Sequence, residues 1–292
     1  MSATRPVTVV VPTIGRPELL AACLASLAAC EPGAEEVLVV DQSGGDAVRS
    51  VVEAYASAGA RVLTLEVANK SLAANLGLEQ ARHDAVLMTD DDCTVAPSWV
   101  GVAWSQLERD LEAMVTGRVL AVGDKLAVPS TIDDETPRDY TGEIHYGALY
   151  GGNMACRASL VLAEGGFDER LTVAEDNDLC YRWLRSGRPL RYEPELVVWH
   201  HAWRSEAEMS RLHHSYGHGQ GAFYAKHLRA GDLAIVPFLA RDLSRGARGI
   251  AAQAVRRRTG WPDPRTGLLP GLLAGLVEGW HTFGSRAGGA DS

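Results

Sequence analysis

Four short apolar runs, each separated from the next by a helix-like segment, constrain the N-terminal third of this chain more than any other feature. The runs are Val7–Val11, Val37–Val40, Val62–Val67 and Ala85–Met88. Runs of this length, rich in β-branched residues, are typical of buried strands. The segments between them have helical patterns: Pro17–Cys30, a stretch that begins at Asp46, and Ser71–Arg82. Strands that alternate with helices predict an α/β, Rossmann-like fold whose sheet is covered on both faces.

The middle of the chain is less regular. Met114–Val122, Leu149–Arg157 and Leu190–His200 are predicted strands, and Glu175–Ser186 is a predicted helix. The polar segment Pro129–His145 is longer than an ordinary connection inside a compact domain, so we expect a binding loop or a mobile segment there. After about Ser205 the pattern is helical to the end.

The composition excludes several classes of protein. The chain has 292 residues, 46% of them hydrophobic, and a net charge of −9, which argues against a nucleic-acid partner. Its five cysteines are scattered and form no CxxC pair, as in proteins of reducing compartments. The first residues run straight into a predicted strand, so we expect no signal peptide, and no apolar stretch reaches the ~18 residues of a spanning helix. We therefore expect a cytoplasmic protein.

Three consecutive aspartates, Asp90–Asp92, directly follow the fourth apolar run. If the strand continues through them, Asp90 and Asp92 share one face while Asp91 points to the other. Open α/β sheets bind ligands at the carboxyl ends of their strands, where two carboxylates on one side suit a hard divalent cation. The alternative is an acidic turn whose side chains are solvated.

Other strand ends carry residues that suit a nucleotide diphosphate. Asp41 ends the second strand and is an acceptor for a base N–H or a ribose hydroxyl, while Arg16 lies near a helix start and suits an anion. No GxGxxG follows the first strand and no GxxxxGK[ST] occurs, which argues against a dinucleotide dehydrogenase and a P-loop enzyme.

A later helix begins with two acidic residues, Glu175 and Asp176. Acids in a first helical turn are favoured by the helix dipole, so they have a purely local explanation. The alternative is catalytic, because Asp176 shares a helix face with Leu179 and Trp183, and a carboxylate on the protein side can accept a proton from a bound hydroxyl. Asp178 and Arg182, four residues apart, are expected to form a surface pair.

These motifs, in this order, resemble the GT-A glycosyltransferases, specifically the large inverting family 2, over about residues 5–225. The matching segments are Val9–Thr13 with Arg16, Val39–Asp41, Asn69–Gly77, Thr89–Asp92 (the DxD motif), Gly151–Asn153 with Arg157, Gly165–Glu169, Glu175–Arg182 and Val198–His200. Two positions depart from the family pattern: Lys70-Ser71 stands where a glycine is usual, and Ala74 where a basic residue is frequent. These departures bear on donor preference.

The resemblance implies a fold, a reaction and a set of roles. The fold would be GT-A, a mixed sheet flanked by helices with a helical C-terminal extension. The enzyme would be a metal-dependent, inverting, hexosyltransferase-type glycosyltransferase with a nucleotide-diphosphate sugar donor and a lipid-linked, saccharide or small-molecule acceptor hydroxyl. Its setting would be cell-surface polysaccharide, glycolipid or natural-product glycosylation.

The same resemblance assigns residues to these roles. Asp92, Asp90 and His200 would hold Mg²⁺ or Mn²⁺, and Asp176 would be the base beside Glu175. The nucleotide sugar would be bound by Pro12, Thr13, Arg16, Asp41, Asn69, Asn75, Asp90 and Asp91, and the acceptor side would contain Gly152, Asn153, Arg157 and Arg182.

Three other classes remain open. A non-catalytic protein on the same fold would bind the sugar nucleotide without transferring sugar. A nucleotidyltransferase usually has a glycine-rich, basic loop after its first strand, and a phosphohydrolase needs a nucleophilic acid there. This chain has Pro12 and Thr13 at that place, which disfavours both.

The C-terminal part differs in charge from the rest. Residues 226–265 contain nine basic and three acidic side chains, a net charge of +6, which leaves −15 on the remainder. We expect a glycosyltransferase domain at 1–225, with a nucleotide-binding half (1–95) and an acceptor half (96–225), and a helical extension at 226–292. Arg241, Arg245, Arg248 and Arg256–Arg258 precede the apolar segment Leu268–Phe283. This extension is expected to contact the inner face of a membrane, to form a homodimer or to pack on the core.

Overall fold

The computed structural model describes residues 3–256 and 265–284, which form two compact units. The first unit ends at Trp203 and leaves out Arg170–Glu175, which belong to the second, helical unit. The predicted boundary between the glycosyltransferase domain and the extension at residue 225 stays a prediction, because the compact units are defined by packing and the predicted domains by function.

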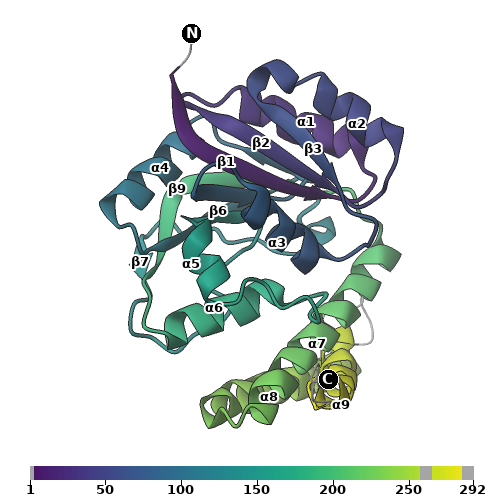
Figure 1. The fold of residues 1–292 in the computed structure, drawn as a ribbon. Helices are drawn as coiled ribbons and strands as arrows, with labels where there is room; N and C mark the ends of the chain where they lie inside the picture. Colours follow the sequence, from purple (N-terminus) through teal and green to yellow (C-terminus); the bar gives the residue numbers. More distant parts are fainter. Residues whose placement is uncertain (1–2, 257–264, 285–292) are drawn as a thin grey trace, which may run out of the picture. The chain divides into compact units, whose positions relative to one another are not determined.

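The first unit is built on one mixed sheet with the strand order β3-β2-β1-β4-β8-β6-β9-β5, and β7 pairs with β9 (Figure 1). Strands β1 to β4 are mutually parallel where they pair, whereas β8 is antiparallel to both β4 and β6. The strands are β1 (Thr4–Thr13), β2 (Gly33–Asp41), β3 (Ala60–Thr64), β4 (Ala85–Thr89), β5 (Cys93–Val95), β6 (Met114–Val122), β7 (Arg138–Asp139), β8 (Asn153–Arg157) and β9 (Leu190–His201). The predicted mixed sheet flanked by helices is confirmed.

Helices cover both faces of this sheet and create two apolar cores (Figure 1). One core holds the inward residues of α1 (Pro17–Ala28), α2 (Asp46–Glu53) and α4 (Trp99–Arg109), and the other holds those of α3 (Lys70–Gln80), α5 (Ala158–Ala163) and α6 (Glu175–Arg185). Because strand side chains alternate, Val9 and Val11 of β1 enter the first core while Val10 enters the second. Packing on both faces therefore holds β1 in place, together with the polar residues at its carboxyl end.

Several predicted elements have different limits in the structure. β8 begins at Asn153 and not at Leu149, because Gly151 and Gly152 form a turn. A Cβ atom on Gly152 would lie 2.4 Å from Asp90 Oδ2, so only glycine fits this close approach. The predicted strand Val62–Val67 is displaced to Ala60–Thr64.

Part of the polar segment 129–145 joins the sheet. β7 pairs with β9 through Arg138 and Tyr192, and Ile132 forms an isolated bridge with Val119 of β6. The expectation of a free loop throughout this segment is therefore wrong. Strand β5, with only three residues, and helix α4 were not predicted, although the buried residues of α4 (Trp99, Val100, Ala103 and Leu107) have helical spacing.

The second unit contains α7 (Glu206–Arg229), the short 3₁₀ turn η3 (Leu233–Ile235), α8 (Val236–Arg256) and α9 (Arg265–Thr282). The first unit has two 3₁₀ turns of its own, η1 (Ala56–Ala58) and η2 (Lys125–Ala127). Arg257 and Arg258, predicted to belong to a basic segment, lie outside the described residues. None of the described helices is both long and apolar enough to cross a membrane.

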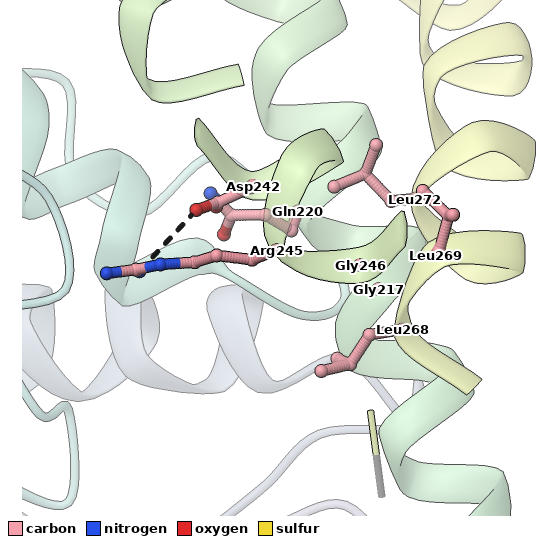
Figure 2. A pocket seen from close by; sticks show the side chains of 8 residues that line it. All are labelled: Gly217, Gln220, Asp242, Arg245, Gly246, Leu268, Leu269 and Leu272. Atoms are coloured by element: carbon pink, nitrogen blue, oxygen red, sulfur yellow. Dashed lines mark ion pairs between the residues drawn. The ribbon is translucent and has the colours of Figure 1, made fainter. Parts of the chain in front are cut away.

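The three helices of the second unit enclose a hollow of about 310 Å³ (Figure 2). Leucines of α9 line one side of it and the Asp242–Arg245 ion pair of α8 lies on another. None of the predicted site residues lines this hollow, so it is separate from the predicted site at the strand ends of the first unit.

Candidate active site

The acidic turn Asp90–Asp92 connects β4 to β5 at the carboxyl end of β4. β4 ends at Thr89, so the three aspartates lie in a turn and not on an extended strand. The predicted alternation of their side chains between two faces is therefore wrong. Asp91 and Asp92 are buried and the side chain of Asp90 is 17% exposed, so the alternative of a solvated turn is also wrong.

One arginine holds two of these acids. Arg16 forms an ion pair with Asp91 Oδ1, its Nε donates to Asp91 Oδ2 at 3.1 Å, and its Nη1 lies 3.4 Å from Asp92 Oδ2. The Thr13 hydroxyl donates to Asp91 Oδ2 at 2.6 Å. Thr13 ends β1, the neighbour of β4, so the parallel pairing of these strands brings the loop after β1 beside the acidic turn.

The two buried acids have different proton affinities. Burial raises the pKa of Asp91 to about 6, although Arg16 and the Thr13 hydroxyl oppose this shift. Burial also favours the neutral form of Asp92, but His200, Arg16 and the Trp203 N–H outweigh it and hold the pKa of Asp92 well below its usual range. Asp92 is therefore the carboxylate that remains charged and able to bind a cation.

An aromatic cluster surrounds Asp92. Trp203 Nε1 donates to Asp92 Oδ2 at 2.8 Å, and its ring lies 5.0 Å from the Arg16 guanidinium. His200 Nε2 lies 3.4 Å from the same oxygen, and His200 Nδ1 contacts the Tyr150 hydroxyl at 3.0 Å. Sequence reasoning predicted Asp92 and His200 but missed Trp203 and Tyr150, because single aromatic residues in loops belong to no recognisable pattern.

The donor atoms around Asp92 fit a divalent cation. His200 Nε2 is buried and, beyond its 3.4 Å approach to Asp92 Oδ2, has no hydrogen-bond partner within the described residues. In the tautomer whose Nδ1–H donates to Tyr150, the Nε2 lone pair would be available to a cation, which would then replace the contact between Nε2 and Asp92. Asp92, Cys93 and His200 have ligand atoms within 4.8 Å of one another. The Cys93 thiol is soft and its pKa is raised well above its usual value by burial, so a hard cation would use Asp92 and His200.

Asp90 lies outside this group. Its Oδ1 forms an ion pair with Lys70 Nζ at 2.9 Å, and Lys70 is the first residue of α3. Lys70 was singled out in the sequence as a departure from the family pattern, but its contact with Asp90 was not foreseen. The assignment of Asp90 to the metal or the donor stays a prediction.

Asp41 lies beside the end of β1. It is level with Thr13 in the β1–β2 register, and Pro12 is level with Val40. Its carboxylate is buried and accepts the backbone N–H of Ser43 at 2.9 Å and the Ser43 hydroxyl at 2.5 Å. The predicted donor residues Pro12, Thr13, Arg16 and Asp41 thus lie on adjacent strand ends.

The two predicted donor-binding asparagines have structural partners. Asn69 caps α3 by accepting the Leu72 N–H at 3.0 Å. Asn75 Oδ1 accepts the Phe167 N–H at 2.8 Å, and its Nδ2 donates to the Phe167 carbonyl at 2.9 Å. Both amides therefore fix the segment that follows α5, and their contact with a nucleotide stays a prediction.

Most predicted acceptor-side residues also hold the backbone. Asn153 is fully buried, and its amide binds the Leu196 carbonyl and Trp99 Nε1. Arg157 is level with Ala85, the first residue of β4, whereas Asn153 is level with the last, Thr89. The structure thus places Arg157 about 13 Å along the strand from the acidic turn and does not bring it into the site.

Arg182 is a structural residue in its observed contacts. It pairs with Asp178 at 2.7 Å and binds the carbonyls of Glu164 and Gly166, which precede the Phe167 segment. Asp178 is fully buried, so the expected surface pair is wrong. A buried pair of this kind rigidifies the loop that its arginine binds.

Asp176 faces the turn before β8. Its Oδ2 accepts the Gly151 N–H at 3.3 Å, and its Oδ1 accepts the Asn177 N–H at 2.8 Å. Burial raises the pKa of Asp176, and the positive charge of Lys70 opposes that shift. Glu175 beside it is buried, and Ala174 before it has a φ of 65°, a strained conformation for a residue with a Cβ atom. Such strain is concentrated at functional sites.

Comparisons with known proteins identify the family of the chain. The family model described as glycosyl transferase family 2 matches residues 8–158. A pre-mycofactocin glycosyltransferase of Mycobacterium tuberculosis is 30% identical over 207 residues, which cover 67% of this chain and 43% of that protein. The chain thus spans less than half the length of this curated relative.

Solved structures share the fold. The mannosyltransferase PcManGT from Pyrobaculum calidifontis, in complex with GDP-Man and Mn²⁺, matches with a TM-score of 0.64 at 18% identity, over 96% of this chain and 90% of that one. S. aureus TarS matches with a TM-score of 0.59 at 20% identity, over 96% of this chain and 55% of that one. A shorter TarS chain, 1–349, in complex with UDP-GlcNAc has a TM-score of 0.58 at 17% identity, over 96% of this chain and 90% of that one.

Proposed function

Because the chain belongs to glycosyl transferase family 2, we propose that it transfers a sugar from a nucleotide-diphosphate donor to an acceptor hydroxyl, with inversion and with the help of a divalent metal. One observation carries this proposal: the turn Gly151-Gly152 contacts both groups that the reaction needs. The Gly151 N–H binds Asp176, and Gly152 lies against Asp90 of the acidic turn. A reacting sugar bound at this turn would have the acidic turn and Asp176 within reach.

The donor would lie along the ends of β1, β2 and β4. Asp41 would accept from the base or ribose. Arg16 and Thr13, which now bind the acidic turn, would contact phosphate oxygens once a cation replaces them there. Asp92 and His200 would hold Mg²⁺ or Mn²⁺, which when bound would offset the negative charge of the departing diphosphate.

Asp176 would take the proton from the acceptor hydroxyl. Burial raises its pKa, which makes it a stronger base than an exposed aspartate. Attack from the face opposite the leaving diphosphate inverts the anomeric configuration in a single displacement, so no covalent sugar–enzyme intermediate forms.

The substrate class follows from the relatives. Solved structures with this fold contain GDP-Man with Mn²⁺ and UDP-GlcNAc, which supports a nucleotide-diphosphate hexose as donor. The acceptor is proposed to be a hydroxyl on a lipid-linked saccharide, a free saccharide or a small molecule.

The test has two steps. A thermal-shift panel of nucleoside diphosphates, with and without Mn²⁺, should show a larger rise in melting temperature for one base when the metal is present. The matching nucleotide sugar should then release its nucleoside diphosphate in the presence of Mn²⁺. Metal-dependent binding without any sugar release or transfer would indicate the non-catalytic alternative, and release of inorganic phosphate would indicate a phosphohydrolase.

A further inference from the structure

Helix α9 of the second unit exposes three large apolar side chains on one face. Leu273, Val277 and Trp280 are 50%, 64% and 46% exposed. Their spacing of four and three residues places them in a single row along the helix, here named the α9 stripe. Three adjacent apolar side chains that are about half exposed or more form a patch that favours contact with another apolar phase.

The opposite face of α9 is already packed against α7 (Figure 1). A Cβ atom on Gly271 would lie 2.3 Å from the carbonyl oxygen of His214, and one on Gly275 would lie 1.8 Å from that of His218. These glycines let the two backbones approach closely, so the orientation of α9 is fixed. The α9 stripe points away from α7 as a consequence, and its exposure is a built feature of the helix pair.

Basic side chains accompany the aromatic residues at the carboxyl end of α9. The Arg229 guanidinium lies 4.8 Å from the centre of the Trp280 ring, and that of Arg170 lies 4.4 Å from the Phe283 ring. Glu278 is the one acidic residue in α9. It is turned about 100° from Val277 and contacts His218 Nε2 of α7 at 2.8 Å. The stripe therefore has the cation of Arg229 beside its Trp280 end and no acid within it.

We propose that the α9 stripe is the surface through which the second unit docks on a lipid bilayer containing anionic lipid. Leu273 and Val277 enter the apolar boundary, and Trp280 lies at the depth of the headgroups, where amphipathic rings are favoured. Arg229 meets the lipid phosphates. Charge complementarity favours this occupant over a second copy of the chain, because α9 offers no acid on this face that could pair with Arg229 of another copy.

The test uses the full-length chain and needs no nucleotide sugar, so its outcome is separate from that of the proposed function. Sedimentation with phosphatidylcholine vesicles that contain phosphatidylglycerol should recover the protein, and vesicles of phosphatidylcholine alone should recover much less. Val277→Asp should weaken binding at least about tenfold, because it removes an apolar side chain that enters the bilayer and adds a negative charge. Val67→Asp is the matched control, since Val67 is also exposed (55%) but lies in the first unit, and it should bind as the parent does.

A second variant tests the charge contribution. Arg229→Gln should weaken binding about fivefold and reduce its dependence on salt. Thermal unfolding of each variant shows whether the fold is retained, and Leu273→Ser replaces Val277→Asp if the latter does not fold. Equal recovery of the parent, Val277→Asp and Val67→Asp would overturn the proposal. The absence of vesicle binding by the parent would also overturn it. If, in addition, Val277→Asp converted a dimer into a monomer in sedimentation velocity, the α9 stripe would be a contact between two copies of the chain.

Discussion

The two ends of the parallel strands contain buried carboxylates with similar partners and opposite electrostatics. At the amino-terminal side, Glu36 of β2 is fully buried and accepts the Thr8 hydroxyl at 2.6 Å and Arg61 Nε at 2.7 Å. The backbone N–H of Arg82 donates to it at 2.8 Å. Burial alone would raise the pKa of Glu36, but these donors lower it, so the ionised form is fully compensated.

At the carboxyl end, Asp91 also accepts a threonine hydroxyl at 2.6 Å, from Thr13, and pairs with Arg16. Thr13 lies five residues beyond Thr8 on β1, about 17 Å along the strand. Here burial raises the pKa to about 6, and the neighbouring charges of Asp92 and Asp90 add to this shift. Arg16 is shared between Asp91 and Asp92, and Asp91 is the acid whose ionised form its neighbours do not fully compensate.

This difference separates structure from function within one sheet. A buried carboxylate with a complete set of hydrogen-bond donors, such as Glu36, stabilises the fold without a bound cation. A buried carboxylate such as Asp91, whose neighbours do not fully compensate its charge, lowers the stability of the fold, and a cation bound nearby would relieve that cost. Substitutions at the carboxyl end should therefore change function with little loss of stability, and substitutions at Glu36 should do the reverse.

The largest expected effect is that of Asp176→Asn. The variant should lose sugar transfer by about 10²- to 10⁴-fold, because an amide cannot accept the proton of the acceptor hydroxyl. Nucleotide binding should be retained, since Asp176 is proposed to contact the acceptor hydroxyl and not the nucleotide. Transfer rates and calorimetric titration with the preferred nucleoside diphosphate measure the two properties. Normal turnover would remove Asp176 as the base, and the exposed Asp139→Asn serves as control.

Asp92→Ala tests the cation side of the comparison. It should abolish the metal dependence of nucleotide affinity, because the pKa of Asp92 is held well below its usual range, which keeps this carboxylate charged. Calorimetric titrations of the parent with and without Mn²⁺ should differ, and those of the variant should coincide. An effect of Mn²⁺ in the variant equal to that in the parent would show that other residues hold the metal.

The sequence was sufficient where one local pattern determines the structure. The apolar runs predicted the order of strands and helices, and the strand limits of β6 agree exactly with the prediction, Met114–Val122. The family resemblance, and not a local pattern, predicted that Asp92 and His200 share a site, and Asp92 Oδ2 and His200 Nε2 lie 3.4 Å apart. Periodicity and strand ends are local properties, so they survive without knowledge of tertiary contacts.

The remaining features depend on tertiary contacts that no local pattern contains. The side-chain directions of Asp90–Asp92 were wrong because strand geometry was extended by three residues into a turn. Asp178 was assigned to the surface, although α6 packs with that side inward. The roles of Trp203 and Tyr150 depend on how loops far apart in sequence meet at Asp92 and His200.

Tyr150→Phe removes one of these unforeseen contacts. Loss of the hydroxyl leaves His200 Nδ1 without its partner, which should weaken Mn²⁺ affinity about tenfold by loosening the imidazole. The nucleotide affinity without metal should stay the same. Tyr55→Phe is the matched control, since Tyr55 Oη makes only a 3.4 Å contact, with the Ala21 carbonyl. Equal Mn²⁺ affinity of the two variants would show that Tyr150 does not orient a metal ligand.

Glu36→Gln should have the smallest effect on activity and a clear effect on stability. The amide keeps the shape but loses the charge-assisted bonds from Arg61 and Thr8, so the free energy of unfolding at neutral pH should fall by about 2 kcal/mol. Urea denaturation measures this difference, while transfer activity of the folded variant should match that of the parent.

The pH dependence of that loss identifies its cause. Because the pKa of Glu36 is lowered in the folded state, its stabilisation is present above the unfolded pKa of about 4.3 and is lost as the pH falls through the lower folded value. The parent and Glu36→Gln should therefore converge in stability in acid. A constant difference between them at all pH values would mean that packing, and not the compensated charge of Glu36, stabilises this end of the sheet. The contrast with the acidic turn would then be one of shape and not of electrostatics.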